Sequence, residues 1–191
     1  MLRLIHLTFV FCAAITFTAV VGFPCNAGEI QEANWPQFRG ADATGVSHNT
    51  GLPDHWSATK NIEWKSDIAG RGWGSPVVWG NNVFIATVVN TGETEPIKKG
   101  LYFGGDRKDI PQSIHEWKIL CLDLATGTTR WEKTVRTGTP TGSIHLKNSY
   151  ASETPVTDGE HVYVCFGNIG LYCFDFNGEQ SWSHELDAHK T

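Results

Sequence analysis

The feature that most constrains the fold of this chain is a unit of sequence that occurs twice, over residues 75–132 and again over residues 154–183. Both copies begin with a Pro-Val pair and pass through a glycine and a β-branched run to a Cys-x-Asp triplet. Both then end on a tryptophan that follows a glycine-containing turn. A chain that repeats one unit of sequence is expected to repeat one supersecondary structure.

Each copy of the unit predicts four short strands. The runs VFIAT and HVYVCF are rich in β-branched and aromatic residues and are bounded by Gly, Asn and Asp. The pair Asn177-Gly178 favours a two-residue hairpin, because both residue types tolerate positive φ. The sequence therefore predicts an all-β fold, a partial β-propeller of four-stranded antiparallel blades. About two blades are expected, together with an orphan closing strand at residues 61–65 that matches only the end of the unit.

The two copies differ in length because the first contains an insertion at about residues 90–115. This stretch is rich in Gly, Lys and Asp, and its composition is typical of a long exposed loop. We therefore divide the chain into residues 1–27, an N-terminal segment at residues 28–60, and propeller blades at residues 61–191 that carry the loop insertion.

Residues 1–27 have the pattern of an export signal. Arg3 provides a positive start, no charged residue occurs from Leu7 to Phe23, and Ala27 supplies a small residue at a cleavage point. This pattern predicts a signal peptide and hence an exported protein, either periplasmic or extracellular. An uncleaved membrane anchor is the nearer alternative, and a buried core helix is the more distant one. Contact with a membrane is expected only if the segment stays uncleaved.

The repeated unit resembles the repeat of pyrroloquinoline-quinone (PQQ)-like propellers. That repeat occurs in quinoprotein alcohol dehydrogenases and in the propeller lipoprotein that helps to assemble outer-membrane proteins. The motif Trp-Pro-Gln-Phe-Arg-Gly at residues 35–40 and the stretches at residues 71–76 and 148–155 are similar to secreted PQQ-like propellers of planctomycete type. The resemblance extends from residue 34 to about residue 186, and it implies the fold rather than a reaction.

The resemblance also implies a length and a role for the recurring tryptophans. A ring of six to eight blades needs about 240–320 residues, so this chain is expected to be the N-terminal portion of a longer propeller. The tryptophans at the end of the partial and the two full units are implied to be structural blade-docking residues: Trp64, Trp131 and Trp182. A role in stacking against a ligand is the alternative.

Three cysteines lie beyond the predicted signal peptide, namely Cys121, Cys165 and Cys173. Cys165 and Cys173 flank a short turn and could face each other across a hairpin, which makes them a candidate disulfide. Alternatively, Cys121 and Cys173 are equivalent positions of the repeat and pack as small apolar residues. An odd number of cysteines leaves at least one thiol unpaired.

Composition and charge narrow the function classes. The formal net charge is −5 and the pI is about 5.9, which argues against binding to nucleic acid because such proteins need a basic face. The eight histidines are scattered singly, so the sequence predicts no catalytic, cofactor-binding or metal-binding residues. The chain also lacks the adjacent cysteines that the resemblance would require beside PQQ.

We therefore interpret the chain as a non-catalytic binding or scaffold module, without a cofactor, that binds a protein or polymer partner on its loop face. The alternative is a fragment of a quinoprotein-type oxidoreductase, for which PQQ and calcium would be the cofactors. Other propeller enzymes stay open, as does a propeller fused to a signalling domain in longer relatives.

Overall fold

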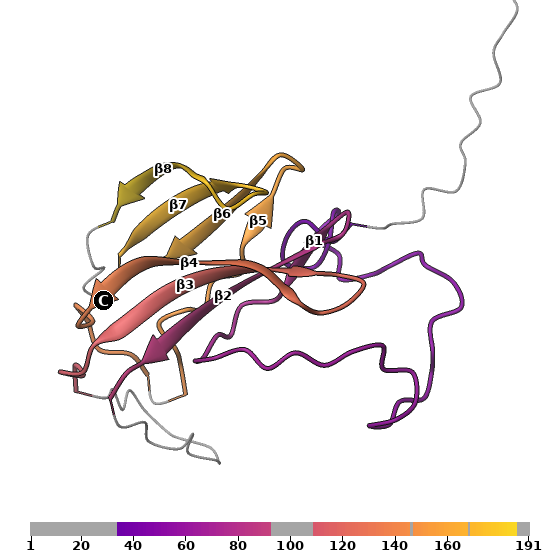
Figure 1. Cartoon of the computed structure of the whole chain (residues 1–191), viewed down its shortest axis with the longest axis horizontal. Helices are drawn as coiled ribbons and strands as arrows, with labels where there is room; N and C mark the ends of the chain where they lie inside the picture. Colours follow the sequence, from indigo (N-terminus) through magenta and orange to yellow (C-terminus); the bar gives the residue numbers. More distant parts are fainter. Residues whose placement is uncertain (1–33, 93–108, 146, 168, 187–191) are drawn as a thin grey trace, which may run out of the picture. The chain divides into compact units, whose positions relative to one another are not determined.

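The computed structural model describes residues 34–92, 109–145, 147–167 and 169–186, and these residues form eight strands and no helix. The first sheet contains β1 (Val77–Trp79), β2 (Asn82–Asn90), β3 (His115–Asp123) and β4 (Thr129–Gly138). The second contains β5 (Val156–Thr157), β6 (His161–Phe166), β7 (Gly170–Asp175) and β8 (Gln180–Glu185). In both sheets, neighbours in the sequence are antiparallel neighbours in space (Figure 1).

The prediction of an all-β chain with two four-stranded antiparallel blades is thus confirmed. The predicted signal peptide at residues 1–27 lies outside the described residues. Within the described ranges, no helix is long and apolar enough to cross a membrane.

The repeat of the sequence is also a repeat of strand register. In the first sheet, Val77 pairs with Phe84, Phe84 with Cys121, and Cys121 with Trp131. The four corresponding residues of the second sheet form the same row across the strands: Val156, Tyr163, Cys173 and Trp182. Because directly paired residues point to the same side of a sheet, each row marks one face of its sheet.

The insertion in the first unit falls between β2 and β3, which are both longer than β6 and β7. The ladder between β2 and β3 reaches the pair Asn90–His115, so part of the extra sequence extends the strands. The connection then runs from Thr91 to Ile114, and its residues 93–108 lie outside the described part of the chain.

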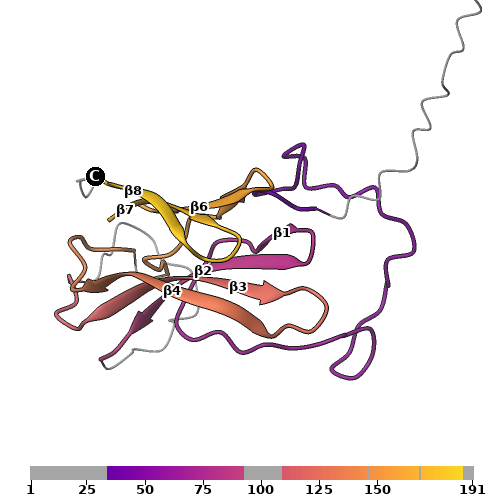
Figure 2. The same ribbon diagram turned by 45° about the horizontal axis from the view of Figure 1, so that its top comes forward.

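The core of the protein lies between the two sheets, which Figure 2 shows as layers. The first sheet contributes Val77, Phe84 and Trp117 to this core, all with 0% of their surface exposed. The second sheet contributes the inward residues of β6, namely Val162, Val164 and Phe166, which are also 0% exposed. Alternation of buried and partly exposed residues along β6 shows that one face of the second sheet packs on the first.

The other face of the first sheet carries a smaller apolar cluster of Val83, Leu120 and Leu122, and Ile68 packs against it. The segment that contains Ile68 also contains the predicted closing strand at residues 61–65. In the structure this stretch is not a strand. The prediction of an orphan strand was wrong because a strand requires a ladder partner, and these residues have none among the described strands.

Candidate functional site

An extended segment with glycine at every second position crosses from the first sheet towards the second. Its residues are Gly70, Arg71, Gly72, Trp73 and Gly74, which we call the glycine strap. Arg71 and Val88 exchange both backbone hydrogen bonds, at N···O distances of 2.9 and 3.1 Å. Further along, Trp73 N donates to Ala151 O at 2.8 Å, and Ser75 N donates to Thr154 Oγ1 at 3.0 Å. The strap is therefore bonded to β2 at one end and to the segment before β5 at the other.

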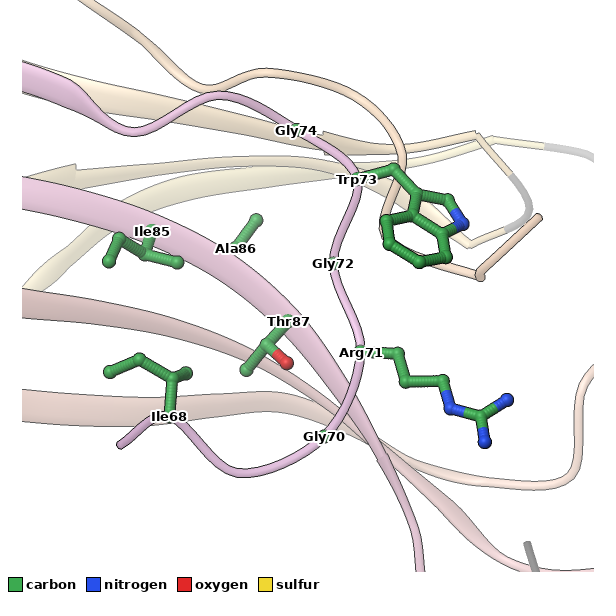
Figure 3. Close-up of a pocket in the computed structure, with 9 residues that line it drawn as sticks. All are labelled: Ile68, Gly70, Arg71, Gly72, Trp73, Gly74, Ile85, Ala86 and Thr87. Atoms are coloured by element: carbon green, nitrogen blue, oxygen red, sulfur yellow. The ribbon is translucent and has the colours of Figure 1, made fainter. Parts of the chain in front are cut away.

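The glycines of the strap allow it to lie directly on neighbouring backbone. A Cβ atom at Gly72 would stand 2.4 Å from Ala86 O, and one at Gly74 would stand 2.4 Å from Glu153 O. Such distances are far inside van der Waals contact, so no side chain fits on this side. Because alternate residues of an extended chain point to opposite sides, Arg71 and Trp73 must both project away from β2, as Figure 3 shows.

The strap borders a shallow hollow of about 320 Å³. Ile68, Ile85, Ala86 and Thr87 form its floor beside the strap, and Thr87 Oγ1 donates a hydrogen bond to Ala69 O at 2.9 Å (Figure 3). The hollow is therefore apolar, with a cation and an indole at its margin.

Trp73 is the most distinctive residue of this site, because 48% of its surface is exposed although its backbone is fixed by hydrogen bonds. Exposed tryptophan and arginine side chains next to one another are typical of surfaces that bind a partner. The sequence analysis used this stretch only as part of a resemblance and missed it as a site. The signal that could have found it is the alternation of glycine with two large side chains.

Two of the three tryptophans at the unit ends meet the turn of a following unit in the same way. Trp64 Nε1 donates to Leu124 O at 2.7 Å, and Trp131 Nε1 donates to Phe176 O at 2.8 Å. Each carbonyl belongs to the residue after the Asp of the Cys-x-Asp triplet, at the turn between the third and fourth strands. The two contacts are therefore equivalent by the repeat.

A glycine in each of these turns leaves room for the indole ring. A Cβ atom at Gly127 would lie 2.3 Å from Trp64 Cε3, and one at Gly178 would lie 2.8 Å from Trp131 Cδ2. Both glycines have positive φ, at 70° and 81°. Any other residue would both strain the turn and strike the ring.

Trp182 is placed differently, since 43% of its surface is exposed and its ring lies 6.0 Å from the ring of Tyr163 in its own sheet. None of the described residues accepts a hydrogen bond from its indole N–H. Its role in docking stays a prediction.

The two cysteines of the candidate disulfide are free thiols in the structure. Cys165 lies opposite Leu171, and Cys173 lies opposite Tyr163, so the cysteines are diagonal neighbours rather than a facing pair. The expected facing geometry was wrong because the ladder continues to the pair Phe166–Gly170, which leaves only a short connection. Burial raises the pKa of both thiols and raises the pKa of Cys121 to about 11.

Carboxylates in the described part of the chain serve turns. Asp123 Oδ1 accepts hydrogen bonds from Ala125 N at 2.9 Å and Thr126 N at 3.0 Å, and its Oδ2 accepts one from Arg130 Nη2 at 2.6 Å. The guanidinium of Arg130 is the main reason why the pKa of Asp123 is lowered. Across the described residues, no group of three His, Cys, Asp or Glu side chains is arranged to hold a metal ion.

Comparison with known families gives a match over residues 105–191 to the PQQ_2 family model, described as "Outer membrane protein assembly factor BamB". Curated protein sequences give no match. Among solved structures, a europium-containing methanol dehydrogenase is similar, with 15% sequence identity and a TM-score of 0.28 over 65% of this chain. The chain spans 26% of the length of that dehydrogenase chain. Residues 105–191 of this all-β chain therefore contain PQQ-like repeat sequence.

Proposed function

We propose that this chain is a non-catalytic binding module whose partner docks on the glycine strap. The observation that supports the proposal most strongly is Trp73, which is 48% exposed and yet held by a backbone hydrogen bond to Ala151. A large side chain on fixed backbone loses little conformational entropy when it is covered, so more of the contact energy appears as affinity.

The chemistry of the strap favours a protein or another polymer as the partner. The indole of Trp73 offers a flat apolar surface with one N–H donor, and Arg71 projects to the same side with a guanidinium that binds carboxylates and carbonyl groups. The hollow beside them is shallow and apolar, which suits one inserted side chain better than an enclosed small molecule. The description of the matched family as an assembly factor supports a protein partner.

Export is part of the same proposal. The pattern of residues 1–27 supports a cleaved signal peptide, with a mature chain in the periplasm or outside the cell. A partner would then be met in that compartment. The partner is proposed to bind without PQQ, calcium or another cofactor.

A photo-crosslinking experiment tests the proposal. A photoreactive phenylalanine analogue replaces Trp73 in the full chain, and the same analogue replaces Trp56 in a matched control, because Trp56 is also exposed, at 62%, but lies away from the strap. We expect a discrete crosslinked partner from position 73 that is lost when Arg71→Ala is added. Equal crosslinking from positions 73 and 56 would show that the strap is not a binding surface.

A further inference from the structure

The outer face of the second sheet has the side chains of a face that the first sheet buries. In the first sheet, the row of Val77, Phe84, Cys121 and Trp131 is covered by the second sheet, and Val77, Phe84 and Cys121 are 0% exposed. The equivalent row of the second sheet is Val156, Tyr163, Cys173 and Trp182. We call this second row, together with Leu171, the outer row.

The outer row is not covered by any described part of the chain. Val156 and Trp182 are each 43% exposed, although their equivalents pack between the sheets. β8, which carries Trp182, is exposed along its whole length. Aliphatic and aromatic side chains in register on an open sheet face mark a surface that is complete only when another element packs on it.

The face that fits the outer row can be identified from the existing contact between the sheets. The row with Trp131 packs on a face that includes Val164, Phe174 and the carbonyl of Phe176. Strand register makes the corresponding residues of the first sheet Ile85, Leu122 and Leu124. One copy of the chain therefore contains a second face of the same design as the one that already receives Trp131.

That second face is occupied only by an irregular segment. Trp64 Nε1 binds Leu124 O, Ser66 Oγ donates to Gly127 O at 2.8 Å, and Ile68 packs on the apolar cluster. The segment forms no ladder with the first sheet there. Leu124 stays 38% exposed and Ile85 is only half-buried. A complete blade would cover this face more fully than the segment does.

We propose that the outer row binds a second copy of this chain, head to tail. In this contact, Trp182 of one copy takes the place of Trp64 on the other copy, and its indole N–H donates to the carbonyl of Leu124 above Gly127. The contact repeats the existing one between Trp131 and the turn of residues 176–178. A heterologous contact of this kind closes into a ring or continues as a filament. With two blades in each copy, two to four copies would provide about 4–8 blades, the range of closed propellers.

The proposal assigns opposite effects to two tryptophans, and sedimentation velocity of the full chain at about 1 to 100 μM can measure both. Trp182→Ala removes the inserted ring and should raise the dissociation constant of self-association by at least tenfold. Trp64→Ala vacates the receiving turn and should lower that constant. Trp56→Ala, which removes an exposed indole elsewhere, should leave it unchanged.

A mixing experiment tests the direction of the contact. Trp182→Ala removes the inserted ring but keeps the receiving turn, whereas Leu124→Glu should block the turn but keep the ring. Each variant alone should be monomeric, and an equimolar mixture should form one-to-one dimers. If Trp182→Ala does not fold, Trp182→Phe, which keeps the ring area and removes the N–H donor, serves in its place.

Two results would overturn the proposal. One is a chain that stays monomeric up to about 100 μM in both the original and the Trp64→Ala forms, which would leave the outer row to an occupant of another kind. The other is self-association that survives Trp182→Ala. Neither result bears on the glycine strap, because Trp73→Ala should leave self-association unchanged and Trp182→Ala should leave crosslinking from position 73 unchanged.

Discussion

A single indole joins the two sheets at the residue scale. Trp131 comes from β4, donates its N–H to Phe176 O, and lies 6.0 Å from the ring of Phe84 and 6.2 Å from the ring of Phe174. It therefore combines one directed bond with apolar contact to both sheets. Its loss would affect the contact between the sheets more than the ladder of β4.

We expect Trp131→Ala to lower the free energy of unfolding by about 3 kcal/mol, near the lower end for a large aromatic residue because the side chain is only half-buried. Gly178→Ala should cost about 1–2 kcal/mol, since it forces a left-handed residue and crowds the same ring. Urea midpoints measure both. Trp56→Ala is the matched control and should stay within about 0.5 kcal/mol. A control as destabilised as Trp131→Ala would contradict this role of Trp131.

The described cysteines should be poorly reactive in the folded protein. Burial raises the pKa of Cys165 and Cys173 and raises that of Cys121 to about 11, so the reactive thiolate is scarce at pH 7.5. We expect peptide mapping after brief iodoacetamide treatment to show little labelling of these three cysteines in native protein and full labelling in urea. A disulfide-linked peptide that contains Cys165 and Cys173 would contradict the free thiols of the structure.

At the scale of elements, the turns are organised by aspartates. Asp158 precedes β6, and its carboxylate accepts hydrogen bonds from Tyr163 Oη at 2.6 Å, His161 N at 2.7 Å and Glu160 N at 2.9 Å. The phenol hydrogen bond is the main cause that lowers the pKa of Asp158 to about 2. The same contact raises the pKa of Tyr163 to about 12, so the phenol keeps the proton that it donates.

These shifts predict how acid affects the β5–β6 turn. A carboxyl group with a lowered pKa in the folded state stabilises the fold above its ordinary pKa near 4, and this contribution is lost as the pH falls towards 2. We expect the urea midpoint to fall between pH 4.5 and pH 2, and to fall less in Asp158→Asn. Asp42→Asn, at an exposed position, is the control for the loss of one charge. Identical pH profiles for Asp158→Asn and the original chain would contradict the assignment.

How far the sequence predicts these elements depends on where the structural signal lies. The strands of both units are predictable because β-branched and aromatic runs alternate with turn residues, as in β6. The segment at residues 61–65 has the same local composition, but a strand also needs a ladder partner, which composition does not reveal. The diagonal placement of Cys165 and Cys173 follows from register, and register depends on the length of the connecting turn.

The glycine strap was not predictable for a further reason. Gly72 and Gly74 are set by the approach of backbone from distant segments, at Ala86 and Glu153. A local pattern shows that glycine alternates with large side chains. It does not show which carbonyl groups take the space of the absent Cβ atoms, or that Trp73 is exposed as a result.

For the whole molecule, PQQ is the cofactor that most needs a direct test. The proposed function predicts no binding of PQQ in the presence of calcium, and equilibrium dialysis of the full chain measures this. A calcium-free sample is the control. Stoichiometric binding at micromolar PQQ, with a quinone absorption band in the retained fraction, would favour the quinoprotein alternative over a non-catalytic binding module.

The tryptophan contacts also give the molecule a direction. Trp64 and Trp131 each reach forward to the turn of a following unit, and neither contact has a counterpart that reaches backward. Each unit therefore behaves as a monomer of a polar polymer, with one end that offers a ring and another that accepts it. Gene duplication could then add or remove whole units without redesigning any interface, because the same carbonyl and the same glycine would recur at every junction. The number of units and the chemistry of their contacts would vary independently in the evolution of such chains.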